Sequence, residues 1–256
     1  MRILICRLGA TPAIFFAFCW DDRSDCLMTR ISKNQRERSG RRASNASPAG
    51  TIPTADTIAE LREAAAGCTA CDLWKRATQT VFGEGSSTAK IMFVGEQPGD
   101  QEDRTGHPFV GPAGRLLNEA LAEAGIERAD VYVTNVVKHF KWTRSERSKR
   151  RIHKKPRYSE IQACRPWLEA EIRVVKPQVL VCLGASAAQS LLGRGFSVNR
   201  QSGQLAESVR APYVTATVHP SSILRAPDSK ARQSQLEAFI SDLKKVARLA
   251  ERRRAA

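Results

Sequence analysis

The sequence predicts an α/β fold: a three-layer α/β/α sandwich around a central four-stranded parallel sheet. Two observations lead to this fold class. Four short apolar runs have the length and composition of buried strands, at 91–94, 131–134, 179–183 and 213–218. Segments with apolar residues at helical spacing lie between these runs. Strands that alternate with helices along a chain form parallel sheets with helices on both faces.

The expected helices, in chain order, are 58–66, 113–124, 158–175, 186–192 and 229–254. The first ends at Gly67, a residue type that commonly follows a helix C-terminus. In sheets of this kind, ligands bind beyond the carboxyl ends of the strands. The segments that follow the four strands should therefore carry the functional site, namely 95–111, 135–157, 184–186 and 219–225.

The chain has 256 residues, enough for one domain with a substantial core, which is expected over 56–250. Residues 1–55 are expected to be mostly disordered, because 29–56 is rich in Ser, Arg, Ala, Pro and Gly. The apolar run 13–18 is too short to span a membrane, and no transmembrane segment is expected elsewhere.

The basic residues of the chain are concentrated in one segment. Overall, 41 Lys and Arg residues stand against 26 Asp and Glu residues, a net charge of +15. Residues 138–157 contain ten of the basic residues and one acidic residue, Glu146. Because this segment lies between two apolar segments, a basic loop on a folded scaffold is expected rather than a tail. The surplus favours a polyanionic partner, with nucleic acid first.

The cysteine pattern points to metal or redox chemistry. The chain has seven cysteines at irregular spacing: Cys6, Cys19, Cys26, Cys68, Cys71, Cys164 and Cys182. An odd number at such spacing argues against a secreted disulfide framework. The Cys-x-x-Cys pair at 68–71 is typical of metal or redox sites.

Side chains suited to base recognition follow the first two predicted strands. Glu96 could orient a water or a histidine, or face a developing cation. Phe109 lies in a Gly/Pro-rich loop and could stack on a base. Asn135 offers a donor and an acceptor that suit a pyrimidine edge. The alternatives are a strand-to-helix loop with capping acids, and an asparagine in a turn.

Two histidines stand out in the other segments. His153 ends the run Lys149-Arg150-Arg151-Ile152-His153, and histidine is well suited to proton transfer or nucleophilic attack near neutral pH. A purely electrostatic basic run is the alternative. His219 follows the last strand, ahead of Ser221 and Arg225, and these side chains could hold a base carbonyl and a phosphate. Here a helix N-cap with a surface arginine is the alternative.

Taken in order, these motifs resemble the family 4 uracil-DNA glycosylases. The similar features are Gly-Glu-x-Pro-Gly, then Gly-x-Pro-Phe-Val-Gly-x-Ala-Gly, Thr-Asn and His-Pro-Ser, and they run from about Cys68 to Arg225. Two departures point to a subgroup. Gln97 stands where many relatives carry a small residue, and the basic insert that ends at His153 is absent from ordinary family 4 enzymes. Both are similar to the UdgX proteins, which bind uracil in DNA and become covalently joined to it through the histidine of that insert.

The resemblance implies a DNA-repair enzyme that excises uracil and then captures C1′ of the abasic site through His153, once in its lifetime. It implies Glu96, His153 and His219 as catalytic residues. The implied contacts to uracil and DNA are Gly95, Gln97, Asp100, Phe109, Asn135, Lys149, Arg150, Arg151, Ser221 and Arg225. The basic residues around His153 are expected to lower its pKa by like-charge repulsion.

The implied partner is uracil-containing DNA, with single strands preferred, bound by a monomer in the bacterial cytoplasm at the nucleoid. Two other functions remain open at this point. One is a multiple-turnover family 4 uracil-DNA glycosylase with a basic loop. The other is a nucleic-acid-binding iron–sulfur protein without glycosylase chemistry, which would have no need of Glu96, Asn135 and His219 together.

The resemblance also implies a [4Fe–4S] cluster with four protein ligands. Cys68 and Cys71 match the first two family cysteines, and Cys164 matches the last. The third family cysteine falls within 136–139, where His139 stands instead, so three cysteines and one histidine are expected. Cys182 is the alternative fourth ligand, although its place within an apolar strand favours a core residue. Zinc is the alternative metal.

Overall fold

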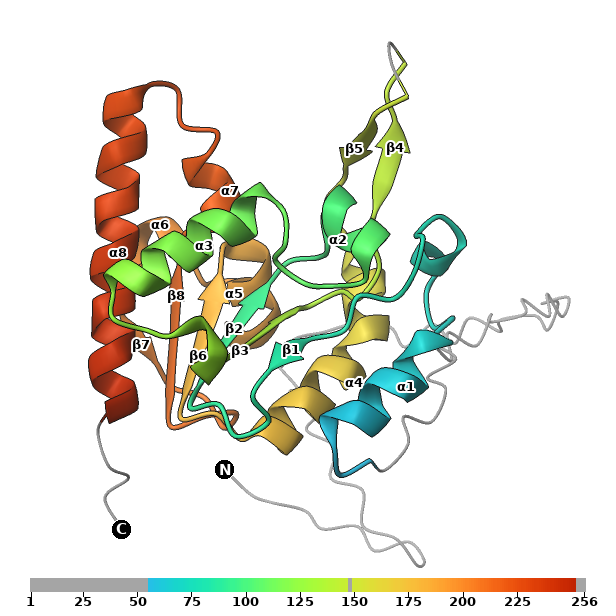
Figure 1. The fold of residues 1–256 in the computed structure, drawn as a ribbon, viewed down its shortest axis with the longest axis horizontal. Coiled ribbons are helices and arrows are strands. Elements are labelled where there is room, and N and C mark those ends of the chain that lie inside the picture. The colour runs from blue at the N-terminus through green and yellow to red at the C-terminus, as the bar shows by residue number, and fades with distance from the viewer. Residues whose placement is uncertain (1–54, 147–148, 252–256) are drawn as a thin grey trace, which may run out of the picture. The chain divides into compact units, whose positions relative to one another are not determined.

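Six strands form one sheet in the order β1-β3-β2-β6-β8-β7 in the computed structural model, which describes residues 55–146 and 149–251 (Figure 1). The four central strands are parallel: β3 (Val131–Asn135), β2 (Ile91–Gly95), β6 (Val179–Leu183) and β8 (Tyr213–Thr217). The fold class and all four predicted strands are confirmed. The segment 1–55, expected to be disordered, lies outside the described residues apart from Ala55.

Two short antiparallel strands extend the predicted sheet at its edges. They are β1 (Glu84–Gly85), beside β3, and β7 (Leu205–Ala206), beside β8. The sequence did not predict them, because two residues are too few to show the alternation that marks a strand. The sheet is therefore mixed, with a parallel centre.

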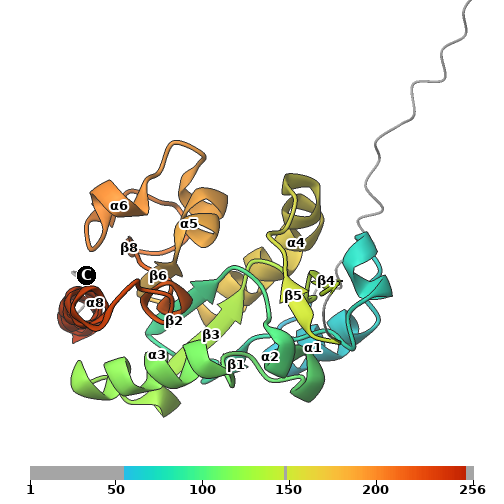
Figure 2. The same cartoon turned by 90° about the horizontal axis from the view of Figure 1, so that it is seen from above.

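Helices cover both faces of the sheet (Figure 2). One face carries α1 (Ile58–Ala66), α4 (Tyr158–Val175) and α5 (Ala185–Leu192), and the other carries α3 (Pro112–Glu123) and α8 (Ser229–Glu251). All five predicted helices are present, with boundaries that differ by a residue. The expected last residues of the final helix, 252–254, lie outside the described residues.

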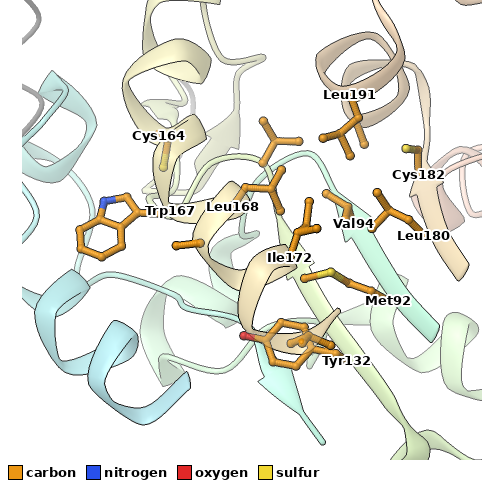
Figure 3. Close-up of a cluster of buried hydrophobic side chains, with 14 of the residues drawn as sticks. Met92, Val94, Tyr132, Cys164, Trp167, Leu168, Ile172, Leu180, Cys182 and Leu191 are labelled. Atoms are coloured by element: carbon orange, nitrogen blue, oxygen red, sulfur yellow. The ribbon is translucent and has the colours of Figure 1, made fainter. Parts of the chain in front are cut away.

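The side chains of each central strand alternate between two cores, which is why the strands are mostly apolar. Met92 and Val94 face the helices α1, α4 and α5, where they pack near Leu168 of α4 (Figure 3). Ile91 and Phe93 face α3 and α8 in the second core. The sheet is thus buried on both sides and holds the loops at its carboxyl edge on a rigid support.

The basic segment forms a β-hairpin rather than the expected loop. Its strands β4 (Trp142–Arg144) and β5 (Arg151–His153) pair with each other, separately from the main sheet, with Trp142 opposite His153. The hairpin rises above the carboxyl edge of the sheet (Figure 1). Residues 147–148 near its tip lie outside the described residues.

The remaining elements are short. They are η1 (Asp72–Lys75), α2 (Asp100–Thr105), η2 (Arg128–Asp130), α6 (Val198–Gln201) and α7 (Pro220–Ile223). Within the described ranges, none of the helices combines the length and the apolar character that crossing a bilayer requires.

Candidate functional site

The predicted site segments meet at the carboxyl edge of the parallel strands. Gly95 ends β2 and is the register partner of Asn135, which ends β3. Gly184 follows β6, and its N–H donates to Thr217 O at the end of β8, at 2.8 Å. His219 comes two residues after that strand end. Residues distant in the sequence therefore lie side by side, because parallel strands end at one edge.

Asn135 and Phe109 pack together on the α carbon of Gly95. A Cβ added to Gly95 would lie 2.4 Å from Asn135 Oδ1 and 2.8 Å from Phe109 Cζ. Both side chains are buried. Only glycine leaves room for this arrangement, so the backbone of β2 approaches the two predicted base-recognition residues directly.

Phe109 is held in an uncommon backbone conformation. Its φ angle is 58°, in the left-handed region, and a Cβ on Gly114 would lie 1.7 Å from Phe109 O. The loop is closed by the buried carboxylate of Glu102, which accepts from Gly99 N at 3.0 Å and from Gly111 N at 2.8 Å. The Phe109 ring stacks beside His219, with centroids 6.4 Å apart and an interplanar angle of 27°.

His219 is presented as a neutral hydrogen-bond donor. Its Nδ1 accepts from Ser221 N at 3.1 Å, which leaves Nε2 as the nitrogen that carries the proton in the neutral ring. Burial lowers the pKa of His219 to about 4, and the positive charges of Arg225 and His153 act in the same direction. Gly184 makes room for the histidine, because a Cβ there would lie 2.9 Å from His219 Cβ.

Gln97 is buried and its amide binds the base of the hairpin. Nε2 donates to Lys154 O at 2.9 Å, and Oε1 accepts from Lys141 N at 3.0 Å. Nε2 also lies 2.8 Å from His153 Nε2. The side chain expected near uracil therefore contacts both ends of the hairpin and the predicted nucleophile.

His153 and Glu96 lie close together across this edge. Their Nε2 and Oε1 atoms are 3.7 Å apart, and the side chains are 50% and 21% exposed. Burial lowers the pKa of His153, Glu96 opposes this shift and Arg225 adds to it. The direction expected from the sequence is confirmed, but its cause was wrong. Burial dominates, and the acting positive charge comes from Arg225 rather than from the neighbouring basic residues.

Arg151 holds the hairpin onto α2. Its guanidinium donates to Asp100 through Nε and to Asp103 Oδ2 through Nη1 at 2.5 Å. The guanidinium carbon also lies 5.3 Å from the Phe140 ring centroid and 5.4 Å from that of Trp142. Two residues expected to contact DNA, Arg151 and Asp100, are thus bound to each other within the protein.

The other expected DNA contacts lie at accessible positions around the site. Lys149 and Arg150 are exposed on the hairpin, and Arg225 is exposed beyond α7. Ser221 is half-buried, and its hydroxyl lies 2.8 Å from His219 Nδ1. Exposed basic side chains are therefore supplied by two separate segments, and Arg225 is close enough to lower the pKa values of His153 and His219.

Three cysteines gather on the α1–α4 side of the sheet. Cys68 and Cys71 flank the turn after α1 and pack on the core that contains Cys164 of α4. Trp167 Nε1 donates to Cys68 Sγ, and Lys138 N donates to Cys164 Sγ, each at 3.2 Å. Burial raises the pKa of Cys164 to about 12, and the other two thiols add to this shift.

His139 lies beside the same turn. It is buried, and its Nε2 is 2.9 Å from Thr80 Oγ1, which donates to Ala65 O at 3.0 Å. Cys182 is a core residue of β6, and Figure 3 places it across the apolar cluster from Cys164. Soft thiol donors and one imidazole suit an iron–sulfur cluster. In the described part of the chain, no three His, Cys, Asp or Glu residues are grouped as a single metal ion requires.

Sequence reasoning missed the buried polar residues that support this site. Glu102 and Asp103 were not among the predicted site residues, yet both are buried, and Asp103 accepts from Thr78 N at 2.9 Å as well as from Arg151. Lys138 was counted with the basic loop, but it is fully buried and paired with Glu171. The position of Lys138 next to an apolar run was the sequence signal that could have predicted the burial of its side chain.

Comparison with known proteins agrees with this geometry. The family profile "Uracil DNA glycosylase superfamily" matches residues 82–244, more than half of the chain. The "Type-4 uracil-DNA glycosylase" of Thermotoga maritima is 40% identical over 171 residues, 66% of this chain and 84% of that protein. The one from Archaeoglobus fulgidus is 38% identical over 189 residues, 71% of this chain and 87% of that protein.

A third relative, the "Type-4 uracil-DNA glycosylase" of Sulfurisphaera tokodaii, is 34% identical over 203 residues. These cover 76% of this chain and 86% of that protein. The profile match includes the strand ends where Gly95, Asn135 and His219 meet. On this basis, the chain belongs to the uracil-DNA glycosylase superfamily.

Proposed function

We propose that this protein excises uracil from DNA. The observation that carries the proposal is the convergence of Phe109, Asn135 and His219 at one edge of the sheet, on the glycines Gly95 and Gly184. An aromatic face, an amide and a neutral imidazole donor are the groups that recognition and release of a pyrimidine require. The printed names of the type-4 relatives support the same activity.

In this proposal, uracil stacks on Phe109 and pairs with the amide of Asn135. The bond between C1′ and N1 breaks, its electron pair leaves with uracil, and the sugar becomes an oxocarbenium ion. His219 donates a hydrogen bond from Nε2 to the departing base and stabilises its negative charge. Glu96 faces the cation and positions a water whose oxygen adds to C1′. The proton that this water loses passes to Glu96 and from there to the uracil anion or to solvent.

The DNA must present an extruded or unpaired base, because Asn135 and Phe109 are buried at the sheet edge. A single strand avoids the cost of unpairing, so we propose that a monomer of the domain 56–250 prefers it. Lys149, Arg150 and Arg225 are exposed around the site and would contact phosphates, together with Ser221.

The test is uracil release from a single-stranded oligonucleotide that contains one uracil, compared with the same strand containing thymine. The wild-type protein should release free uracil and leave an abasic site. His219→Gln should slow release by about 10²–10³-fold, because the donor to the leaving base is displaced. No uracil release by the wild-type protein, at any protein-to-DNA ratio, would exclude the proposal.

A second candidate outcome is covalent capture of the DNA by His153. The proximity of His153 to Glu96 and Gln97 favours it, since an imidazole near a carboxylate is a suitable nucleophile. After the C1′–N1 bond breaks, a ring nitrogen of His153 donates its lone pair to C1′. The imidazolium so formed passes its N–H proton to Glu96 or to solvent. The names of the relatives support excision and do not mention capture.

Denaturing electrophoresis separates the two outcomes. Capture predicts a heat-stable protein–DNA band, at most one adduct per protein molecule, and loss of the band in His153→Ala. Lys230→Ala, on the first turn of α8, is the control and should keep the band. Several uracils released per protein molecule, without such a band, would establish ordinary turnover instead.

We further propose that Cys68, Cys71, Cys164 and His139 hold a [4Fe–4S] cluster. The clustered thiols, their two N–H donors and the neighbouring imidazole support this ligand set. When bound, such a cluster would cross-link α4 to the turn that follows α1, and it can exchange an electron. A visible absorbance band with about four irons and four sulfides per chain is expected. A colourless protein that contains one zinc ion per chain would contradict the proposed iron–sulfur cluster.

A further inference from the structure

An ion pair between Lys138 and Glu171 lies fully buried beneath the candidate site. Their side chains are 1% and 0% exposed, and Lys138 Nζ is 2.5 Å from Glu171 Oε2. Removing two charges from water has a large desolvation cost, and apolar residues of similar size often stabilise a core as well or better. Stability alone therefore does not account for the ion pair, and the groups that it contacts indicate a further role.

The ammonium of Lys138 uses all three of its donors. Besides Glu171, it donates to Thr134 Oγ1 at 2.6 Å and to the backbone carbonyl of Asn135 at 2.7 Å. The Thr134 hydroxyl in turn donates to Glu171 Oε1 at 2.9 Å. All three N–H groups of the ammonium are therefore hydrogen-bonded. This network fixes the end of β3 in one conformation.

Glu171 is fixed just as fully from the other side. Its Oε1 accepts from Gly83 N and from the hydroxyl of Tyr132, both at 3.0 Å. A Cβ on Gly83 would lie 2.4 Å from the same oxygen, so the chain passes directly over the carboxylate. The acceptor for Lys138 is thus held by α4, by β3 and by the segment before β1.

A chain of hydrogen bonds continues from Lys138 into the candidate site. The Asn135 carbonyl that accepts from Lys138 belongs to the peptide whose N–H, on Val136, donates to Gly95 O at 2.9 Å. The next N–H, on Val137, donates to Glu96 O at 3.1 Å. The turn after β3 is therefore hydrogen-bonded to Gly95 and Glu96 on one side and to the Lys138–Glu171 ion pair on the other.

We propose that the Lys138–Glu171 pair is a positioning device for base recognition. By fixing the Asn135 carbonyl, it orients the Asn135 amide over Gly95 and so determines the preference for uracil over other pyrimidines. Lys138 and Glu171 are positioning residues and do not touch the base. This inference rests on the proposed function, because the base read by Asn135 is taken to be uracil.

The experiment compares single and double substitutions. Lys138→Met alone leaves a buried carboxylate without its cation and should lower the urea concentration at which the protein unfolds. Lys138→Met combined with Glu171→Gln removes both charges and keeps an oxygen acceptor for Gly83 and Tyr132. The double variant should therefore be more stable in urea than the single variant.

The deciding measurement is the ratio of affinities for single strands with uracil and with thymine, each carrying a 2′-fluorine on that nucleotide so that its C1′–N1 bond is not cleaved. The folded double variant should lose about tenfold or more of the wild-type ratio. The matched control is Arg210→Met with Glu169→Gln, a half-buried pair at 2.8 Å on the α4 side, which should keep the ratio. Thr134→Val is a milder variant for the case that the double variant does not fold, and it should lose part of the ratio.

The outcomes separate this inference from the function on which it rests. A wild-type protein without any uracil preference contradicts the proposed function. A wild-type protein with that preference, together with a double variant or Thr134→Val that keeps it in full, overturns the positioning role alone. A control variant that loses the ratio equally would also overturn it, because the effect would then follow from stability.

Discussion

His153 Nε2 lies 3.7 Å from Glu96 Oε1, although one residue ends a strand of the hairpin and the other follows a strand of the main sheet. The carboxylate raises the pKa of His153 against the lowering effects of burial and of Arg225. The two side chains thus interact electrostatically at the carboxyl edge of the sheet. This relationship gives the first prediction.

Glu96→Gln should lower the pKa of His153 further, because the charge that opposes the shift is lost. It should also slow uracil release and any adduct formation by about 10²-fold or more, since the group that faces the cation and accepts the proton is removed. NMR titration of the His153 ring and single-turnover assays measure the two effects. Glu127→Gln, at the opposite edge of the sheet, is the control. An unchanged titration would argue against contact between the two side chains.

Gln97→Ala should loosen the hairpin without unfolding the domain. The amide side chain provides hydrogen bonds to the backbone of Lys141 and Lys154 at the base of the hairpin. Hydrogen exchange of the amides near Lys141 and Lys154 should become faster. Gln189→Ala, which removes one bond to Phe196 O, should leave the hairpin unaffected. Equal protection of the hairpin in both variants would show that Gln97 is dispensable.

Gly95→Ala should reduce uracil release strongly while the fold persists. A methyl group would overlap Asn135 Oδ1 and Phe109 Cζ, and displacement of such groups by about 1 Å can cost about 10²-fold in rate. Overpacking should also destabilise the protein by about 1–3 kcal/mol. Gly67→Ala, where a Cβ meets nothing within 4 Å, is the matched control. Full activity in Gly95→Ala would mean that the two side chains do not act from this position.

Stability should fall as the pH is lowered from about 6.5 to about 4, in part because of His219. Its pKa is lowered from 6.5 to about 4 in the folded protein. Within this window the unfolded chain binds a proton that the folded chain does not, so protons favour unfolding. Urea unfolding at several pH values measures the slope. His219→Gln should make the dependence shallower, and an unchanged slope would show that His219 titrates normally.

Removal of an exposed cation near the site should weaken the salt dependence of DNA binding. Lys149→Ala and Arg225→Ala should each reduce the slope of log K against log salt concentration by about 1, because one phosphate contact is lost. Affinity for uracil and thymine strands should fall alike in Lys149→Ala. Lys230→Ala, on the first turn of α8, should leave the slope unchanged. A wild-type slope in all three variants would place the DNA elsewhere.

The sequence by itself determined the four central strands of the sheet and the edge at which the candidate site residues lie. The runs around Phe93, Val133, Val181 and Ala216 are apolar because both faces of each strand are buried, so local composition was enough to find them. Gly95, Asn135 and His219 follow parallel strands, and strand direction alone brings such ends to one edge.

Only the tertiary structure decided how the charged residues are used. Arg151 and Lys138 belong to the same basic segment, yet Arg151 binds Asp100 and Asp103 while Lys138 is buried against Glu171. Sequence patterns report periodicity over neighbouring residues, whereas an ion pair depends on which distant segments meet and how much water they exclude. For that reason the basic segment was predicted as a basic loop, and the fold made it a hairpin held by Asp100 and the buried Asp103.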